Sequence, residues 1–264
     1  MLENKKEFKL IPKKNPKSLL PNALTIFGVC LGLSSIKFAL DANYTIAIIA
    51  IGFAAILDTL DGRVARLIKG TSKVGKELDS LTDVISFGVA PGFIMYFWTL
   101  NQIGNLGWML VLIYPVCCAL RLARFNLTTI EESEPWKINF FEGVPSPAAA
   151  GLVLLPLILN LSGLIQIENY TALSTAVILT TSILMVSKIP TYSLKRIVIP
   201  RHLAIFLLLG LGIYVSLLIF YTFDTLFFTG IIYLILIPVS FFHYRQKNKK
   251  KFVTSKMEDD EDVL

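Results

Sequence analysis

Residues 58–83 place four aspartates, with glycine and arginine between them, in an otherwise apolar part of the chain. Asp58 and Asp61 are three apart at the end of an apolar run of helical length, so they share one helix face. Asp79 and Asp83 are four apart at the start of the next run and share a face in the same way. The connection between the two runs is rich in glycine and small polar residues. We therefore expect the chain to turn back there and bring the two pairs face to face.

Four carboxylates gathered inside a membrane need a counter-charge. Each one costs several kcal/mol in hydrocarbon unless it is neutralised, and together they repel one another. Divalent cations supply that charge, and ligation by oxygen alone indicates Mg²⁺ or Mn²⁺, or else Ca²⁺, rather than zinc. The sequence therefore predicts a metal site formed by Asp58, Asp61, Asp79 and Asp83.

Two neighbours of the aspartates suit phosphate chemistry. Gly62 lacks a side chain where a ligand could approach the backbone, and Arg66, one turn later, carries a planar donor fork that matches phosphate oxygens. Together with the metal site they indicate phosphoryl transfer. A charged loop with ordinary helix-capping acids would explain any one aspartate. It does not explain all four, because these are four of the six aspartates between residues 18 and 245.

The rest of the chain has the composition of an integral membrane protein. Of its 264 residues, 54% are hydrophobic and 17% charged, and the mean hydropathy is +0.65. About 20 apolar residues in a helix cross the roughly 30 Å hydrocarbon core of a bilayer. Runs of that kind predict an all-α, polytopic helical bundle of about eight transmembrane helices, near residues 20–40, 44–66, 78–100, 107–127, 147–165, 171–188, 203–221 and 226–244.

The basic residues fall almost entirely on one side of these predicted spans. Both terminal segments and the connections after the second, fourth and sixth spans hold 24 of the 25 lysines and arginines, which leaves Lys37 on the other side. Cytoplasmic flanks accumulate such residues. Both termini and the acidic site are therefore expected to face the cytoplasm from the cell membrane. The net charge of +6 is then orientation charge, and no nucleic-acid partner is expected.

Composition divides the chain into three parts. Residues 1–18 are a basic cytoplasmic segment, and residues 19–245 are the transmembrane domain. Residues 246–264 change from basic to acidic and are predicted to form a disordered cytoplasmic tail.

The spacing of the acidic segment resembles the signature of the CDP-alcohol phosphotransferases. The pattern D-x2-D-G-x2-A-R-x8-G-x3-D-x3-D is met in full by Asp58, Asp61, Gly62, Ala65, Arg66, Gly75, Asp79 and Asp83. Members of that family are integral membrane enzymes that replace the CMP of a CDP-linked lipid or alcohol with a second alcohol. They use two divalent cations and are commonly homodimers. The resemblance implies the same features here, with Mg²⁺ or Mn²⁺ as the metal.

The resemblance also implies roles for single residues. Asp58, Asp61 and Asp79 would hold metal, with Asp79 shared between both ions. Asp83 would be a further ligand and the base that takes the proton from the acceptor hydroxyl. Contacts to the CDP-diacylglycerol donor are implied for Gly62, Arg66, Ser72 and, at the start of the first span, Asn22 and Thr25. A plain helix N-terminus explains the last two equally well.

Three further segments resemble bacterial and archaeal phosphatidylserine synthases: SFGVAP at 86–91, ALRLARFN at 119–126 and FFEGVPSPAAA at 140–150. They favour L-serine as the acceptor, and its carboxylate needs a cation. Arg121 and Arg124, three apart at the end of the fourth span, are the candidates for that contact. Ser86, near Asp83, is predicted to shape the acceptor pocket. Positive-inside anchoring is the alternative explanation for the two arginines.

The sequence therefore predicts transfer of a phosphatidyl group from CDP-diacylglycerol to L-serine, which gives phosphatidylserine and CMP. The nearest alternative keeps this chemistry with glycerol 3-phosphate, inositol phosphate or another alcohol as the acceptor, and a second basic cluster would favour it. A divalent-cation transporter is a more remote alternative. It explains the carboxylates but not Gly62 or Arg66, because a fixed cation beside a cation pathway is unfavourable.

Overall fold

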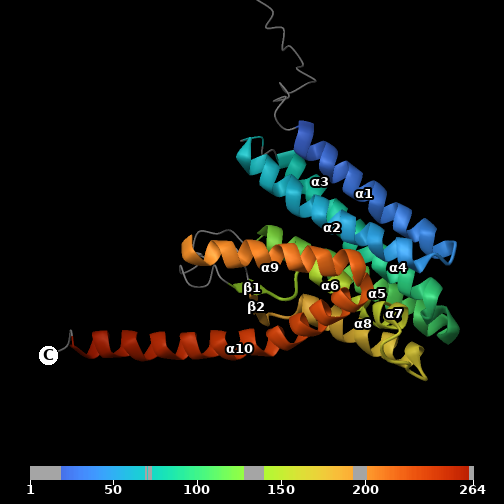
Figure 1. Ribbon diagram of the computed structural model, residues 1–264. Helices are drawn as coiled ribbons and strands as arrows, with labels where there is room; N and C mark the ends of the chain where they lie inside the picture. Colours follow the sequence, from blue (N-terminus) through green and yellow to red (C-terminus); the bar gives the residue numbers. More distant parts are fainter. Residues whose placement is uncertain (1–18, 69, 71–72, 128–139, 193–200, 262–264) are drawn as a thin grey trace, which may run out of the picture.

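Two long helices begin the bundle and present the first half of the acidic motif. The computed structural model describes residues 19–68, 70, 73–127, 140–192 and 201–261. Helices α1 (Leu19–Leu40) and α2 (Tyr44–Leu67) pack along each other and are joined by a three-residue turn (Figure 1). The Asn43 side chain caps α2 by accepting a hydrogen bond from the Ile46 amide at 3.4 Å.

The next span is assembled from three consecutive helical pieces. They are α3 (Lys73–Asp83), the π-helical turn η2 (Val84–Val89) and α4 (Ala90–Trp98). The π turn begins directly after Asp83, and the hydroxyl of Tyr114 donates to the carbonyl of Phe87 within it at 2.9 Å. Wide turns of this kind shift the register of a helix and occur often at functional sites.

The remaining elements surround this span and complete the bundle. A short 3-10 turn, η3 (Leu100–Ile103), leads to α5 (Asn105–Leu127). The C-terminal half contains β1 (Phe140–Glu142), α6 (Ser146–Val153), α7 (Leu155–Ser162), α8 (Tyr170–Val186), β2 (Pro190–Tyr192), α9 (Arg201–Phe220) and α10 (Thr222–Glu261). Strands β1 and β2 pair antiparallel, with Phe141 opposite Thr191. This small sheet was not predicted, since three-residue strands leave no periodic signal.

The polytopic, α-helical class is confirmed. Within the described residues, six helical segments are long and apolar enough to cross a membrane: Leu19–Leu40, Tyr44–Leu67, Val74–Trp98, Asn105–Leu127, Leu203–Phe220 and Thr222–Lys247. They correspond to six of the eight predicted spans. The other two predicted spans are shorter helices. The run 147–165 is divided into α6 and α7 at Leu154, where Pro156 removes a backbone donor, and α8 has 17 residues.

The ends of the bundle differ in character. The α1–α2, α4–α5, α7–α8 and α9–α10 connections lie at one end (Figure 1). The C-termini of α2 and α5, which carry Arg66 and Arg124, therefore lie at the other. This separation agrees with the one-sided distribution of basic residues, while the membrane face that each end occupies stays a prediction. Helix α10 is helical to Glu261, although disorder is predicted from residue 246, and the many lysines there have good helix propensity.

The buried core lies among η2, α4, α5, α6, α7 and α8. Phe87, Ile94, Tyr114, Leu157 and Met185 have no exposed surface. Large apolar side chains cover the outer faces instead, and none of the Leu203–Phe220 span is buried. That inverted pattern suits a helix bundle whose outside is solvated by lipid.

Candidate metal and phosphoryl-transfer site

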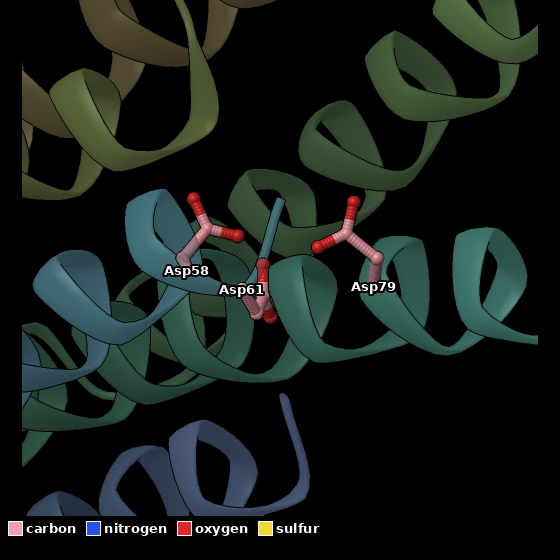
Figure 2. Close-up of side chains that lie close together, drawn as sticks. All are labelled: Asp58, Asp61 and Asp79. Atoms are coloured by element: carbon pink, nitrogen blue, oxygen red, sulfur yellow. The ribbon is translucent and has the colours of Figure 1, made fainter. Parts of the chain in front are cut away.

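Helices α2 and α3 bring three of the four motif aspartates together. Each of Asp58, Asp61 and Asp79 offers a carboxylate oxygen, and these oxygens all lie within 4.8 Å of one another. Asp61 is only 4% exposed, and the other two are half-buried. Figure 2 shows the side chains of Asp58 and Asp61 from α2 and of Asp79 from α3 gathered around one space. The predicted approach of the two pairs is thus present in the structure.

Asp83 adjoins this group from the last turn of α3. Asp58 approaches both Asp79 and Asp83 within hydrogen-bonding reach. One carboxylate oxygen of Asp83, Oδ1, is buried and has no hydrogen-bond partner among the described residues. The other, Oδ2, accepts a long hydrogen bond from the Ser146 hydroxyl at 3.5 Å. Asp83 therefore has an acceptor available for a proton or for a metal ion.

The carboxylates of Asp58, Asp61 and Asp79 form no salt bridge with a described residue. Across the described ranges the sole salt bridge joins Lys37 to Asp41, on the opposite side of the bundle from the motif. Asp61 is oriented by a neutral group, because the Thr25 hydroxyl donates to its Oδ2 at 2.7 Å. Clustered, partly buried carboxylates without a cationic partner are the donor set of a hard divalent cation. The residues present thus fit such an ion.

A second polar group lies against Asp83. Arg121 of α5 is 8% exposed, and its Nη1 donates to the Ser146 hydroxyl at 2.7 Å. Ser146 begins α6, is fully buried, and stands between Arg121 and Asp83. Nε of Arg121 is buried and has no partner among the described residues. A guanidinium whose buried Nε–H has no described partner thus lies next to the predicted base.

Two other predicted acceptor residues make structural contacts. The guanidinium of Arg124 donates to the carbonyls of Val186 and Ser187, at 2.9 and 3.1 Å, where α8 ends. The Ser86 hydroxyl donates to the carbonyl of Gly28 in α1 at 3.3 Å. Both contacts favour roles in helix packing. The predicted contact with the acceptor is better supported for Arg121 than for either of them.

The predicted donor-binding residues surround the same end of α2. Thr25 contacts Asp61 directly, and Asn22 is half-buried one turn earlier in α1. A side chain at Gly62 would meet no atom within 4 Å, so the backbone there faces open space. Arg66 is exposed in the last turn of α2. Ser72 lies outside the described residues.

The sequence left two contributions unassigned. Ser146 lies in the segment FFEGVPSPAAA, which did not mark it as a link between two site residues, and here it bridges Arg121 and Asp83. The aromatic residue Tyr233 of α10 also approaches Arg121. No motif marks Tyr233. It lies in a long apolar helix, and the apolar pattern of that helix predicts a membrane span but no site residue.

Comparison with known proteins agrees with the motif and the geometry. The family model described as CDP-alcohol phosphatidyltransferase matches residues 18–237. A CDP-diacylglycerol--serine O-phosphatidyltransferase from Mycobacterium leprae (strain TN) is 37% identical over 228 residues, which are 86% of this chain and 76% of that protein. A protein of the same name from Helicobacter pylori (strain ATCC 700392 / 26695) is 40% identical over 183 residues, 69% of this chain and 76% of the relative. This chain belongs to the CDP-alcohol phosphatidyltransferase family.

Proposed function

We propose that this protein transfers the phosphatidyl group of CDP-diacylglycerol to L-serine, with phosphatidylserine and CMP as products. The names of its relatives support this reaction. The observation that carries the choice of acceptor is the buried guanidinium of Arg121 beside Asp83. A cation next to the base suits a small alcohol that carries its own carboxylate.

We propose further that two divalent cations, Mg²⁺ or Mn²⁺, bind Asp58, Asp61, Asp79 and Asp83, with Asp79 shared between them. The close approach of three carboxylate oxygens and the unpartnered Oδ1 of Asp83 support this ligand set. When bound, such ions stabilise negative charge on the phosphate oxygens. The Thr25 hydroxyl holds the Asp61 carboxylate in place as an outer support.

The proton and the donor are handled by the chain itself. Asp83 accepts the proton of the serine hydroxyl, whose oxygen forms a bond to phosphorus as the bond to the CMP oxygen breaks. The Ser146 hydroxyl holds the side chains of Asp83 and Arg121 next to each other, because it accepts a hydrogen bond from Arg121 and donates one to Asp83. Contacts with the CDP part of the donor are assigned to Asn22, Thr25, Gly62, Arg66 and Ser72, which, apart from Ser72, lie at or near the end of α2 that carries the motif.

The multi-pass architecture gives the reaction its setting. We propose a cell-membrane enzyme with both termini and the active site on the cytoplasmic face, because the described arginines of the motif end agree with the positive-inside rule. A homodimer is proposed from the family resemblance. The partners are then the lipid substrate, the amino acid and the bilayer.

Release of CMP from CDP-diacylglycerol tests the proposal. Purified protein is given Mn²⁺ or Mg²⁺ and, separately, L-serine, glycerol 3-phosphate, inositol phosphate or glycerol. Serine-dependent release of CMP with formation of phosphatidylserine is expected. Release that depends on another alcohol would replace serine by that acceptor. Metal uptake into vesicles without any CMP release would instead favour the transporter. Asp41→Asn, at an aspartate that is salt-bridged to Lys37, is the matched control for every aspartate variant.

A further inference from the structure

Three helices contribute unsatisfied polar atoms in Asp83, in Arg121 beside it, and in Tyr233 next to Arg121. Six buried side-chain atoms in the described part of the chain have no hydrogen-bond partner. Three of them are Oδ1 of Asp83 in α3, Nε of Arg121 in α5 and the hydroxyl of Tyr233 in α10. A buried polar atom without a partner costs free energy. Arg121 interacts with each of the other two side chains, and the three unpartnered atoms therefore indicate that a polar ligand completes the arrangement.

Tyr233 reaches this place from a helix that carries no family motif. Its ring packs against the apolar core, which fixes the direction of the side chain. Its phenol approaches Thr191 of β2 and is close enough to Arg121 for an electrostatic interaction. The Thr191 hydroxyl is already used as a donor, because it donates to the carbonyl of Gly143 at 2.8 Å. The Tyr233 hydroxyl itself forms no hydrogen bond with a described residue, so its proton is available to a ligand.

Arg121 presents a matching edge. Nη1 is occupied by Ser146, and Nε has no partner in the described part of the chain. The side of a guanidinium that contains Nε and Nη2 can bind the two oxygens of a carboxylate in parallel. A phenol donates one further hydrogen bond to such a group. Arg121 therefore offers only donors to a ligand between the two side chains, and the Tyr233 hydroxyl can add one more donor.

We propose that Tyr233 is a specificity-determining residue that binds the carboxylate of the acceptor amino acid together with Arg121. This inference rests on the proposed serine transfer and extends it to the C-terminal helix. With the carboxylate held between α5 and α10, the hydroxyl of a short β-hydroxy amino acid is directed toward Asp83. A neutral alcohol lacks the group that would satisfy these donors, so the enzyme discriminates against it.

Tyr233→Phe tests the proposal because it removes one oxygen and keeps the ring. Apparent KM values for L-serine and CDP-diacylglycerol and the kcat are measured in one membrane preparation. We expect the serine KM to rise about tenfold, as for loss of a hydrogen bond to a charged group, with the donor KM within about twofold of the wild type. Tyr214→Phe is the matched control, since its hydroxyl bonds Thr229 at 3.2 Å between α9 and α10, outside the acceptor site.

The outcomes separate the inference from the function on which it rests. An unchanged serine KM in an active Tyr233→Phe enzyme overturns the role of Tyr233 and leaves serine transfer intact. An equal rise of both KM values, or loss of activity with a lower unfolding temperature in detergent, would assign the hydroxyl to folding and also overturn it. If the wild type releases CMP only with an alcohol that has no carboxylate, the proposed function fails and the carboxylate contact fails with it.

Discussion

Separate alanine substitutions at Arg121 and Arg124 give the sharpest test of how the acceptor is bound. The two residues are one helical turn apart in α5 and carry the same charge, so they contribute equally to membrane orientation. Their surroundings differ. Arg121 is buried beside Asp83 and Ser146, while Arg124 binds the carbonyls of Val186 and Ser187 at the end of α8.

The expected magnitudes follow from these contacts. Arg121→Ala removes the proposed charge-assisted contact with the serine carboxylate. Such a contact is worth about 1.5 to 3 kcal/mol, which corresponds to roughly a ten- to hundredfold loss of kcat/KM for serine. Arg124→Ala removes two hydrogen bonds to carbonyls, each worth about 1 kcal/mol net. It should lower the free energy of unfolding by about 2 kcal/mol and leave the serine KM near the wild-type value.

The assay measures KM for serine and for CDP-diacylglycerol in one membrane preparation, together with unfolding temperatures in detergent. A selective rise of the serine KM in Arg121→Ala supports the assignment. Equal, small effects of Arg121→Ala on both substrates would refute it and leave serine specificity dependent on family membership alone. A rise of the serine KM alone in Arg124→Ala would show that Arg124 takes part in acceptor binding in addition to its contact with α8.

Three further changes address the metal, the base and the packing. Asp79→Asn should abolish activity and weaken binding of both cations, measured by Mn²⁺ titration, because one shared carboxylate leaves two coordination shells; near-normal turnover at saturating Mn²⁺ would contradict the two-metal assignment. Asp83→Asn should keep CDP-diacylglycerol binding and lose about 10² to 10⁴ in turnover; failure to bind the donor, with normal turnover once saturated, would place Asp83 at the donor instead. Gly32→Ala should lower the free energy of unfolding by about 1 to 3 kcal/mol, since the added Cβ would lie 2.4 Å from Oγ of Ser86. Thermal unfolding checks it against Gly52→Ala, which meets nothing within 4 Å, and equal stabilities would show that α1 shifts freely.

The acidic cluster could be predicted from sequence because its order is local. Helical periodicity places Asp58 beside Asp61 and Asp79 near Asp83, and a short connection limits how far apart the two helices can lie. Hydropathy predicted the helical class for the same reason, since the bilayer fixes the length of a span. Neither signal contains information about which distant side chains meet.

The acceptor side depends on such distant contacts. Arg121, Ser146 and Tyr233 are separated by 25 to 112 positions from one another, and only tertiary packing brings them together. The π turn after Asp83 is equally hidden from sequence. The Tyr114 hydroxyl of α5 donates to the Phe87 carbonyl within it, and no local pattern marks that contact. The division of the predicted span 147–165 at Leu154 differs from these features, because Pro156 marks it in the sequence.

One glycine in a sequence motif acts on the site indirectly. Gly143, in the segment FFEGVPSPAAA, has φ +73°, and a Cβ there would lie 2.6 Å from the carbonyl oxygen of Met185 and 2.9 Å from that of Ser187. Any other residue would therefore push the β1 connection away from the end of α8. That connection leads directly to Ser146 at the start of α6. The missing side chain of Gly143 therefore helps to set the position of the hydroxyl between Arg121 and Asp83.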